Sequence, residues 1–467
     1  MFSDKNNPFL QTWRNLLKKN TAQTAIPSTQ GQPLRSFQEI ENNSNSLAEK
    51  WKKQGLQEQL FSLQVPNSPQ FPEIILAAWK IRSGLILLPA DMPSQEVEAI
   101  EKRSSAAARI TIDLRSDKLE LHKIPPSLQP HTLPLPAVIK VTSGSTAQPR
   151  LVHMSAQQLF ADAQNIIQGM EITATDIQYG LIPWSHSYGF SNLISPLFIQ
   201  GSTLVCTSDA MPQAIRNGIL QSSASVFPGV PAHFRALAKL NSPLPDSLRL
   251  CISAGAPLDA ATANTFYKNT GLFLHSFYGS SECGGICYDP DGRSALGLDA
   301  FVGPPLPGVD LRPVSGQNTT EGIKIEVRGP AVAGDVFRPD DLLEKLPNGY
   351  RILGRDSDFI NIGGKKISPL QIEKYLLNCA EVAEALVVGG IPKNSDREQI
   401  AALLVSKNAN SSPEKNPELQ RQILSELTPH LPAWSLPREI LFLPALPVNS
   451  RGKINRKQIF QSYFYDM

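Results

Sequence analysis

Small and hydroxylated residues interrupt an apolar run at residues 141–150, VTSGSTAQPR. They leave several hydroxyl groups and many accessible backbone N–H groups along a short loop. Both kinds of donor suit the oxygens of a phosphate group. The G-x-x-x-x-G-K-[ST] spacing of the common phosphate-binding loop is absent, and for this segment alone a plain turn is the simpler explanation.

A second segment, FYGSSECGG at residues 277–285, brings an aromatic ring, open backbone and a carboxylate close together in sequence. The ring of Tyr278 beside Gly279 suits the stacking of a base or the closing of a pocket. Glu282 beside a phosphate loop requires a cation between the two anions, because they otherwise repel. Taken alone, this segment is also explained by a surface turn with a solvated glutamate.

Two later segments add charged side chains. In FRPDDLLEKLPNGYRILGRDSDFINIGGKKI, residues 337–367, Asp341 offers two acceptor oxygens to a ribose diol, and Arg355 offers charge-assisted contacts. In LPVNSRGKINRK, residues 446–457, Lys453 follows a glycine in a basic loop. A polar hairpin and a solvated lysine explain these segments when each is read by itself.

Composition excludes several classes of protein. With 467 residues, 41% hydrophobic and 18% charged, the chain is typical of a globular protein of two or three domains. Its net charge of +2 argues against a generic nucleic-acid binder. The five cysteines form no C-x-x-C pair, and Cys283 and Cys287 lack histidines at metal-site spacing, so we expect buried or bystander thiols. Neither a signal peptide nor a membrane span is expected, and we predict a cytoplasmic location.

The elements that must position these residues alternate between helical and strand-like patterns, which predicts an α/β fold. Residues 36–55 have helical apolar spacing and end at a glycine. The strands predicted within 137–144, 202–208 and 248–255 end in small residues, at the strand ends where α/β sheets bind ligands. The last hundred residues, with a helix and a strand in 370–390 and a strand at 399–406, predict a compact domain of their own.

Taken in order, these segments resemble the core motifs of the adenylate-forming, or AMP-binding, superfamily, which includes acyl-CoA synthetases and aryl-CoA ligases. The resemblance covers nearly the whole chain. Its other motifs are IPWSHSYGF, FPGVPAHFRAL, LRLCISAGAPL, VGPPLPGVDLRPV, IEVRGPAV and GRDSDFINIGGKKISPLQIE. It implies a large N-terminal domain of α/β sheets plus a small β-barrel at residues 1–354. A hinge at 355–358 and a small mobile α+β domain at 359–467 would follow.

The resemblance implies an ATP-dependent ligase that needs Mg²⁺. A carboxylate attacks the α-phosphorus of ATP, and a thiol then displaces AMP from the acyl-adenylate. Lys453, His186 and Ser281 would act in catalysis, and Glu282 would hold the metal. The residues implied in ATP or AMP binding are Thr142, Ser143, Gly144, Ser145, Thr146, Arg150, Gly255, Ala256, Pro257, Tyr278, Gly279, Asp341 and Arg355.

The same resemblance implies a second half-reaction in the small domain. Gly363 and Gly364 would admit the thiol arm of CoA, or the phosphopantetheine of an acyl carrier protein, after rotation about Ser357. The acyl pocket would take a small-molecule carboxylic acid, and the residue types suggest an apolar one, either aromatic or of medium chain length. Its predicted residues are Ser187, Tyr188, Phe190, Phe227, Val230 and Gly284; core packing is the alternative for Phe227 and Val230. A monomer or homodimer is expected.

Some positions depart from the family pattern. Ala147-Gln148-Pro149-Arg150 stands where Gly-x-Pro-Lys is usual, Pro339-Asp340-Asp341 where Thr-Gly-Asp is usual, and Ser357 where the hinge is usually Asp or Lys. We favour an active CoA ligase. Transfer to a carrier protein and a nucleotide-binding relative with weakened turnover are the alternatives. An amino-acid-activating domain is less favoured, because the segment around His186 has no aspartate to pair with a substrate amine.

Overall fold

The computed structural model describes residues 7–113, 116, 118–125, 134–142, 149–240, 242–319, 322–363, 365–395, 397–407, 417–447 and 456–465. The chain divides into two compact units. The first comprises Met1–Arg312, Glu326–Pro339 and Lys345–Arg351, and the second comprises Pro313–Ile325, Asp340–Glu344 and Ile352–Met467. The mixed α/β class expected from the sequence is confirmed, whereas the domain limits at 354 and 359 stay a prediction.

The first sheet of the larger unit has the strand order β6-β5-β3-β4-β7-β8. The inner strands pair in parallel, and β6 and β8 pair antiparallel at the edges. Strands β3 and β4 are buried at every residue, because elements cover both of their faces. Their bounds are β3 (Leu60–Leu63), β4 (Gly84–Leu87), β5 (Ala108–Asp113), β6 (Lys118–Lys123), β7 (Val138–Thr142) and β8 (Arg150–Met154).

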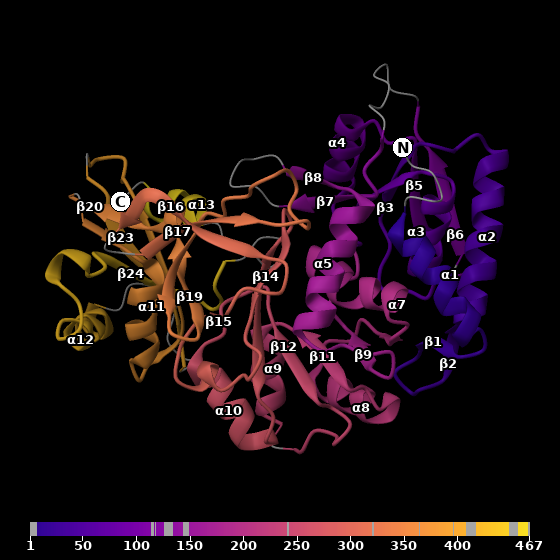
Figure 1. The fold of residues 1–467 in the computed structure, drawn as a ribbon. Coiled ribbons are helices and arrows are strands. Elements are labelled where there is room, and N and C mark those ends of the chain that lie inside the picture. Colours follow the sequence, from indigo (N-terminus) through magenta and orange to yellow (C-terminus); the bar gives the residue numbers. More distant parts are fainter. Residues whose placement is uncertain are drawn as a thin grey trace. The chain divides into compact units, whose positions relative to one another are not determined.

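Four helices and a short hairpin accompany this sheet, and Figure 1 shows three of the helices, α1, α2 and α3, grouped beside β3, β5 and β6. Apolar residues at helical spacing give each helix a buried face, as in α2, which the sequence predicts within residues 36–55. The bounds are α1 (Pro8–Asn20), β1 (Thr24–Pro27), β2 (Pro33–Ser36), α2 (Phe37–Lys53), α3 (Gln70–Lys80) and α4 (Ser94–Ser104).

The second sheet has the order β10-β9-β11-β12-β13-β14, parallel except for the last pair. Its strands are β9 (Ile177–Gly180), β10 (Thr203–Cys206), β11 (Val226–Gly229), β12 (Leu250–Ser253), β13 (Leu274–Ser280) and β14 (Gly284–Tyr288). The accompanying helices are α5 (Ala156–Gly169), α6 (Ser187–Gly189), the π-helix η1 (Phe190–Ile194), α7 (Ser195–Ile199), α8 (Pro212–Ser222), α9 (Pro231–Ala238), α10 (Ala260–Thr270) and η2 (Ser294–Leu296).

The division between the units passes through four strands, β16 (Asp310–Thr319), β17 (Gly322–Arg328), β18 (Asp341–Leu346) and β19 (Gly349–Arg355). In the first unit, β15 (Phe301–Gly303) pairs antiparallel with the start of β19. In the second unit, Ile323 of β17 lies opposite Leu343 of β18. Each unit therefore contains several separate stretches of the chain.

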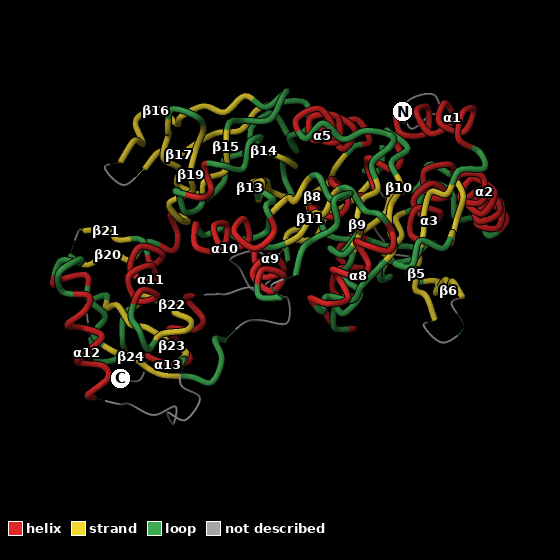
Figure 2. Tube along the Cα trace, turned by 90° about the horizontal axis from the view of Figure 1, so that it is seen from below, coloured by secondary structure: helices red, strands yellow, loops and turns green. Residues whose placement is uncertain are grey.

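The rest of the second unit is a small α+β body, whose elements appear as one group in Figure 2. A sheet of order β22-β23-β24 packs with its helices around a core that includes Ile372, Val387 and Leu427. The bounds are η3 (Asp356–Asp358), β20 (Ile360–Ile362), β21 (Lys365–Ile367), α11 (Pro369–Asn378), β22 (Val382–Gly390), β23 (Gln399–Ser406), α12 (Pro417–Leu427), η4 (Ala433–Ser435), β24 (Glu439–Phe442) and α13 (Arg456–Phe464). None of the helices that the structure describes is long and apolar enough to cross a membrane.

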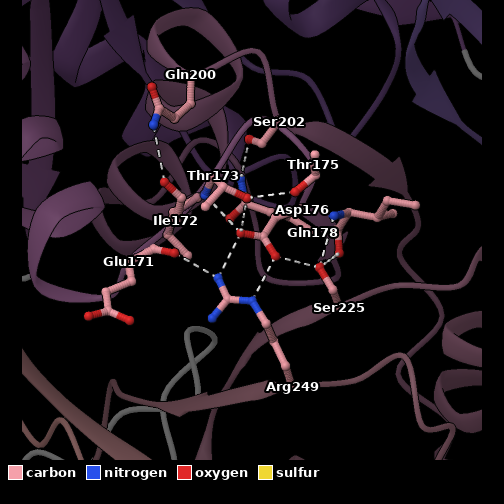
Figure 3. A network of polar contacts seen from close by, with 11 residues as sticks. Glu171, Ile172, Thr173, Thr175, Asp176, Gln178, Gln200, Ser202, Ser225 and Arg249 are labelled. Carbon is pink, nitrogen blue, oxygen red and sulfur yellow. Dashed lines mark hydrogen bonds and ion pairs between the residues drawn. The ribbon is translucent and has the colours of Figure 1, made fainter.

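The buried carboxylate of Asp176 connects the amino ends of three parallel strands, β9, β11 and β12, through hydrogen bonds (Figure 3). Asp176, just before β9, accepts hydrogen bonds from Arg249 Nε and Nη2 at 2.9 and 2.7 Å, and from the Ser225 hydroxyl at 2.7 Å. The Thr173 N–H donates to it at 2.8 Å, and Arg249 also donates to the Glu171 carbonyl at 2.8 Å. Burial alone raises the pKa of Asp176, but these donors outweigh it and lower the pKa to about 2.

Replacing Arg249 with Met is expected to reduce the free energy of unfolding at pH 7 by about 1–3 kcal/mol, because Asp176 then lacks its charged donor. The guanidinium is 42% exposed, so solvent screening favours the lower part of this range. Since the pKa of Asp176 is lower in the folded protein than its unfolded value of about 3.9, the stabilisation is present above that value. It is lost as the pH falls toward 2.

Urea unfolding of both proteins at several pH values measures this difference, which should stay constant from pH 7 to about 5 and shrink below pH 4. The control is Lys52→Met, which removes an exposed ion pair with Glu49 and should cost less than about 1 kcal/mol. A difference that does not depend on pH would contradict the role of Asp176.

Candidate functional site

The segment predicted to bind phosphate begins at the carboxyl end of β7. Thr142 ends this strand and lies opposite Arg150, the first residue of β8, in the antiparallel pair. Arg150 is exposed, and the preceding Pro149 carbonyl accepts a hydrogen bond from Arg103 at 2.5 Å. The predicted residues between them, Ser143, Gly144, Ser145 and Thr146, lie outside the described residues.

The loops after β11 and β12 lie side by side at the carboxyl edge of the second sheet. The Ala254 N–H donates to the Gly229 carbonyl at 3.1 Å. Gly255, Ala256 and Pro257 then form an exposed stretch in which Gly255 has a φ of +84°. A Cβ placed on Gly255 would lie 3.5 Å from the Val230 side chain. Residues predicted for the nucleotide and acyl sites are therefore neighbours here.

The hairpin of β13 and β14 carries the aromatic residue and the predicted metal ligand. Tyr278 is buried and lies opposite Cys287, with a bulge between Tyr278 and Gly279. At the tip, the Glu282 N–H donates to the Ser280 hydroxyl at 3.2 Å. The Glu282 carbonyl accepts from the Ala333 N–H at 2.7 Å, which fixes the backbone of the tip.

Glu282 suits a magnesium ion that is shared with a polyphosphate. Mg²⁺ is commonly held by one or two carboxylates together with substrate phosphates. No group of three or more histidine, cysteine, aspartate or glutamate side chains suited to a metal is present among the described residues. A single carboxylate at a half-exposed hairpin tip therefore fits a metal that arrives with its nucleotide better than a closed protein cage.

His186 begins the helical segment α6-η1-α7, at the carboxyl edge near β9. Its side chain is exposed, and its backbone N–H donates to the Pro183 carbonyl at 3.1 Å. Two residues further, the Tyr188 ring stacks on Phe277, with centroids 5.8 Å apart. Burial raises the pKa of Tyr188, and its hydroxyl lies within hydrogen-bond distance of the Gly229 and Ile252 carbonyls. The Tyr188 side chain is therefore uncharged, and backbone carbonyls hold its hydroxyl in place.

Two predicted acyl-pocket residues are fully buried in apolar clusters. Phe190 packs in the cluster that includes Trp184 and Phe198. Phe227 packs against Tyr179, Phe234 and the His233 ring. These contacts give both rings a packing role, which is the alternative weighed from the sequence for Phe227, and their place in the acyl pocket stays a prediction.

A buried aspartate that the sequence analysis did not single out organises the neighbourhood of Gly284. Asp162 on α5 is 1% exposed. It accepts hydrogen bonds from the Gly285 N–H at 2.8 Å and from the Ser191 hydroxyl at 2.6 Å. Gly284 has a φ of +69°, and a Cβ there would lie 2.1 Å from the Asp162 carboxyl. Asp162 therefore joins β14, α5 and the π-helix, and it requires glycine at position 284.

The second unit holds the residues predicted for the ribose and the hinge. Arg355 Nε lies 3.8 Å from Asp341 Oδ1, a charged pair in which the arginine is exposed. The Ser357 hydroxyl donates to the Asp340 carboxylate, and the Asp356 N–H donates to the Asp340 carbonyl at 2.7 Å.

The predicted thiol site is in the same unit. Gly363 has a φ of +61° and forms the turn between β20 and β21, with open space where a Cβ would be. Gly364 and Lys453 lie outside the described residues.

The Asp162 contact predicts that Gly284→Ala is disruptive, because the new methyl group meets the carboxyl while the backbone keeps a strained φ. We expect the free energy of unfolding to fall by about 2–4 kcal/mol. The matched control is Gly271→Ala, where φ is +74° but nothing lies within 4 Å of the added atom. It should lose only the strain, about 1–2 kcal/mol. Equal losses in urea unfolding of the two variants would contradict the steric role of Asp162.

Comparison with known proteins identifies the family. The model of the AMP-binding enzyme family matches residues 16–334, and that of the AMP-binding enzyme C-terminal domain matches residues 371–453. A 3,4-dihydroxybenzoate–[aryl-carrier protein] ligase of Bacillus anthracis is 24% identical over 378 residues, which cover 80% of this chain and 84% of the relative. The mitochondrial malonate–CoA ligase of Homo sapiens is 26% identical over 70% of this chain and 66% of its own length.

The fold is likewise that of solved adenylate-forming enzymes. O-succinylbenzoate Coenzyme A synthetase from Bacillus subtilis, in complex with AMP, aligns with a TM-score of 0.81 and 19% identity, covering 96% of this chain and 97% of that structure. The likeness extends over both units. Because the first family model alone spans well over half of the residues, the chain belongs to the AMP-binding enzyme family.

Proposed function

We propose that the chain is an acid–thiol ligase. It activates a carboxylic acid with ATP to an acyl-adenylate and pyrophosphate, and a thiol then takes the acyl group and releases AMP. The observation that carries this proposal is the arrangement at the carboxyl edge of the second sheet. There the Gly255 loop, Val230 and the β13–β14 hairpin follow neighbouring parallel strands, as ligand-binding loops do in open α/β sheets.

Separate segments of the chain bind the phosphates, the adenine and the ribose of the nucleotide. We assign the β- and γ-phosphates to the hydroxyl and N–H donors of residues 142–146, with added charge from Arg150. Gly255–Pro257 and Tyr278 with Gly279 form the adenine site, Ser281 contacts the α-phosphate, and Glu282 holds Mg²⁺ when it is bound. A magnesium ion held there would supply positive charge that offsets the charge of the phosphates. Asp341, already paired with Arg355, binds the ribose hydroxyls.

Bringing two anions together is the main chemical difficulty, so positioning and charge neutralisation account for most of the catalysis. Lys453 bridges the acid carboxylate and the α-phosphate during adenylation, and His186 is the second residue assigned to this step. We infer that the small domain of residues 359–467 then turns about Ser357, within a hinge at 355–358, and presents Gly363 and Gly364 to the pantetheine arm. Alternation of this kind needs only a few residues to absorb backbone change.

Coenzyme A is the favoured thiol, and the phosphopantetheine of a carrier protein is the second candidate. The Bacillus anthracis relative is named for a carrier protein and the human relative for CoA, so the relatives support both candidate thiols. Both relatives are also named for acids that carry a second polar group. The deciding experiment is pyrophosphate release with a panel of acids, followed by thioester formation with CoA or a carrier protein as acceptor. ATP binding without pyrophosphate release from any acid would refute the ligase.

Replacing Lys453 with Ala should lower adenylation by at least about 100-fold while ATP binding survives, since the ammonium acts chiefly on charge that develops in the transition state. ATP–pyrophosphate exchange measures the first quantity, and calorimetric titration with ATP measures the second. The control is Lys457→Ala, an exposed lysine on α13 of the same basic segment, which should exchange at the parent rate. Unchanged exchange in the Lys453 variant would remove this residue from its assigned role.

A further inference from the structure

One lysine lies inside the first unit without a hydrogen-bond partner. Lys140 is 2% exposed, in the middle of β7 between Ile139 and Val141. Its Nζ has no hydrogen-bond partner among the residues that the structure describes. An amine in such a place costs stability, because it loses water without gaining acceptors. Groups of this kind concentrate at functional sites.

The face of β7 on which Lys140 lies follows from the alternation of side chains along the strand. Val138 belongs to the same apolar cluster as Leu159 of α5, whereas Ile139 belongs to a different cluster on the other face. Lys140 therefore shares the face of Val138 and of Thr142, toward α5. It is two residues before the predicted phosphate loop, on the side where Asp162 lies.

No carboxylate in the described part of the chain forms an ion pair with Lys140. Burial lowers the pKa of the amine, and Asp162 and Glu282 partly oppose this through their negative charge. Asp162 gives its oxygens instead to the Gly285 N–H and the Ser191 hydroxyl. The Asp162 carboxylate is thus held by other donors, and the lysine amine has no acceptor among the described residues.

The position connects this amine to the acyl half of the proposed site. Its electrostatic neighbours Asp162, Glu282 and Cys283 surround the turn that leads into Gly284, which the sequence places in the acyl pocket. Asp162, which accepts from the Gly285 N–H just after this turn, also accepts from the Ser191 hydroxyl, one residue after Phe190. The amine therefore lies near the turn that leads into the predicted acyl-pocket residue Gly284.

We propose that Lys140 binds an acceptor group on the acyl part of the substrate, so that the enzyme selects acids with a second carboxylate, a hydroxyl or a carbonyl group. This inference rests on the proposed ligase function. It replaces the apolar acid suggested by the residue types of the pocket. A site built to hydrogen-bond a polar substituent discriminates strongly against the analogue that lacks it, because its own buried group is then unpaired.

The test compares acids that differ only in the acceptor group: butanoate with succinate, and benzoate with its 3-hydroxy and 3-carboxy derivatives. Pyrophosphate release by the parent protein should give kcat/KM at least about 100-fold higher for one acceptor-bearing acid than for its apolar partner. In Lys140→Met this ratio should fall at least tenfold. The control, Lys80→Met, removes a lysine that is paired with Glu41 at 2.7 Å and should keep the parent ratio.

Thermal unfolding separates this effect from loss of fold. A methionine of similar length removes an unpaired buried amine, so the midpoint of Lys140→Met should equal or exceed that of the parent. A parent protein that prefers the apolar acid of every pair would overturn the inference, as would an unchanged ratio in the variant. An equal loss for all acids with a raised KM for ATP would also overturn it, by assigning Lys140 to the nucleotide. Only a parent protein that releases no pyrophosphate with any acid counts against the ligase itself.

Discussion

The Asp176–Arg249 pair fixes the geometry on which the second sheet depends. It joins the residues just before β9, β11 and β12, so these short parallel strands start in register. Each strand is only four residues long, and their opposite ends therefore also fall at nearly the same level. The loops with Val230, Gly255 and His186 follow directly from those ends. A polar network at the amino ends of these strands thereby sets the spacing of the loops at their carboxyl ends.

Asp162 performs a related function closer to the candidate site. Its two oxygens hold the β14 backbone and the π-helix at the same time, and the absence of a side chain at Gly284 allows this approach. The hairpin tip with Ser281 and Glu282 is anchored on its other side through the Ala333 N–H. Hydrogen bonds to the backbone at Glu282 and at Gly285 thus fix the main chain around the predicted metal ligand.

The sequence predicts the elements well wherever a periodic pattern continues over several residues. The helix of 36–55 is α2, the strand of 399–406 is β23, and the helix and strand in 370–390 are α11 and β22. The family is predicted correctly because its motifs occur in order along the chain. The sequence does not predict the roles of Asp162 and Lys140, for a physical reason. Each is a single polar residue within an apolar pattern, and its significance depends on which distant groups the fold brings near it.

The aromatic residues of the predicted acyl pocket show the opposite difficulty. Phe190 and Phe227 follow motif positions that suggest a ligand, yet both contribute to clusters of large apolar side chains. A phenylalanine at a strand or helix end satisfies either role equally well in sequence, since apolar character is all that either requires. Only the directions of the side chains distinguish the two, and these depend on the packing of helices around the sheet.

The π-helix η1 is a place where a change of one residue in chain length would alter the contacts of Asp162. Residues Ser187–Ile199 form one continuous helical segment in which η1 accommodates a wider turn, and Ser195 donates to Phe190 five residues earlier. Such wide turns correspond to one residue more than a regular helix needs. Deleting one residue would restore regular winding and rotate Ser191 away from Asp162. A codon lost or gained here would therefore change the contacts of Asp162 beside the predicted acyl-pocket residue Gly284 in one genetic step, without a change in the strands of either sheet.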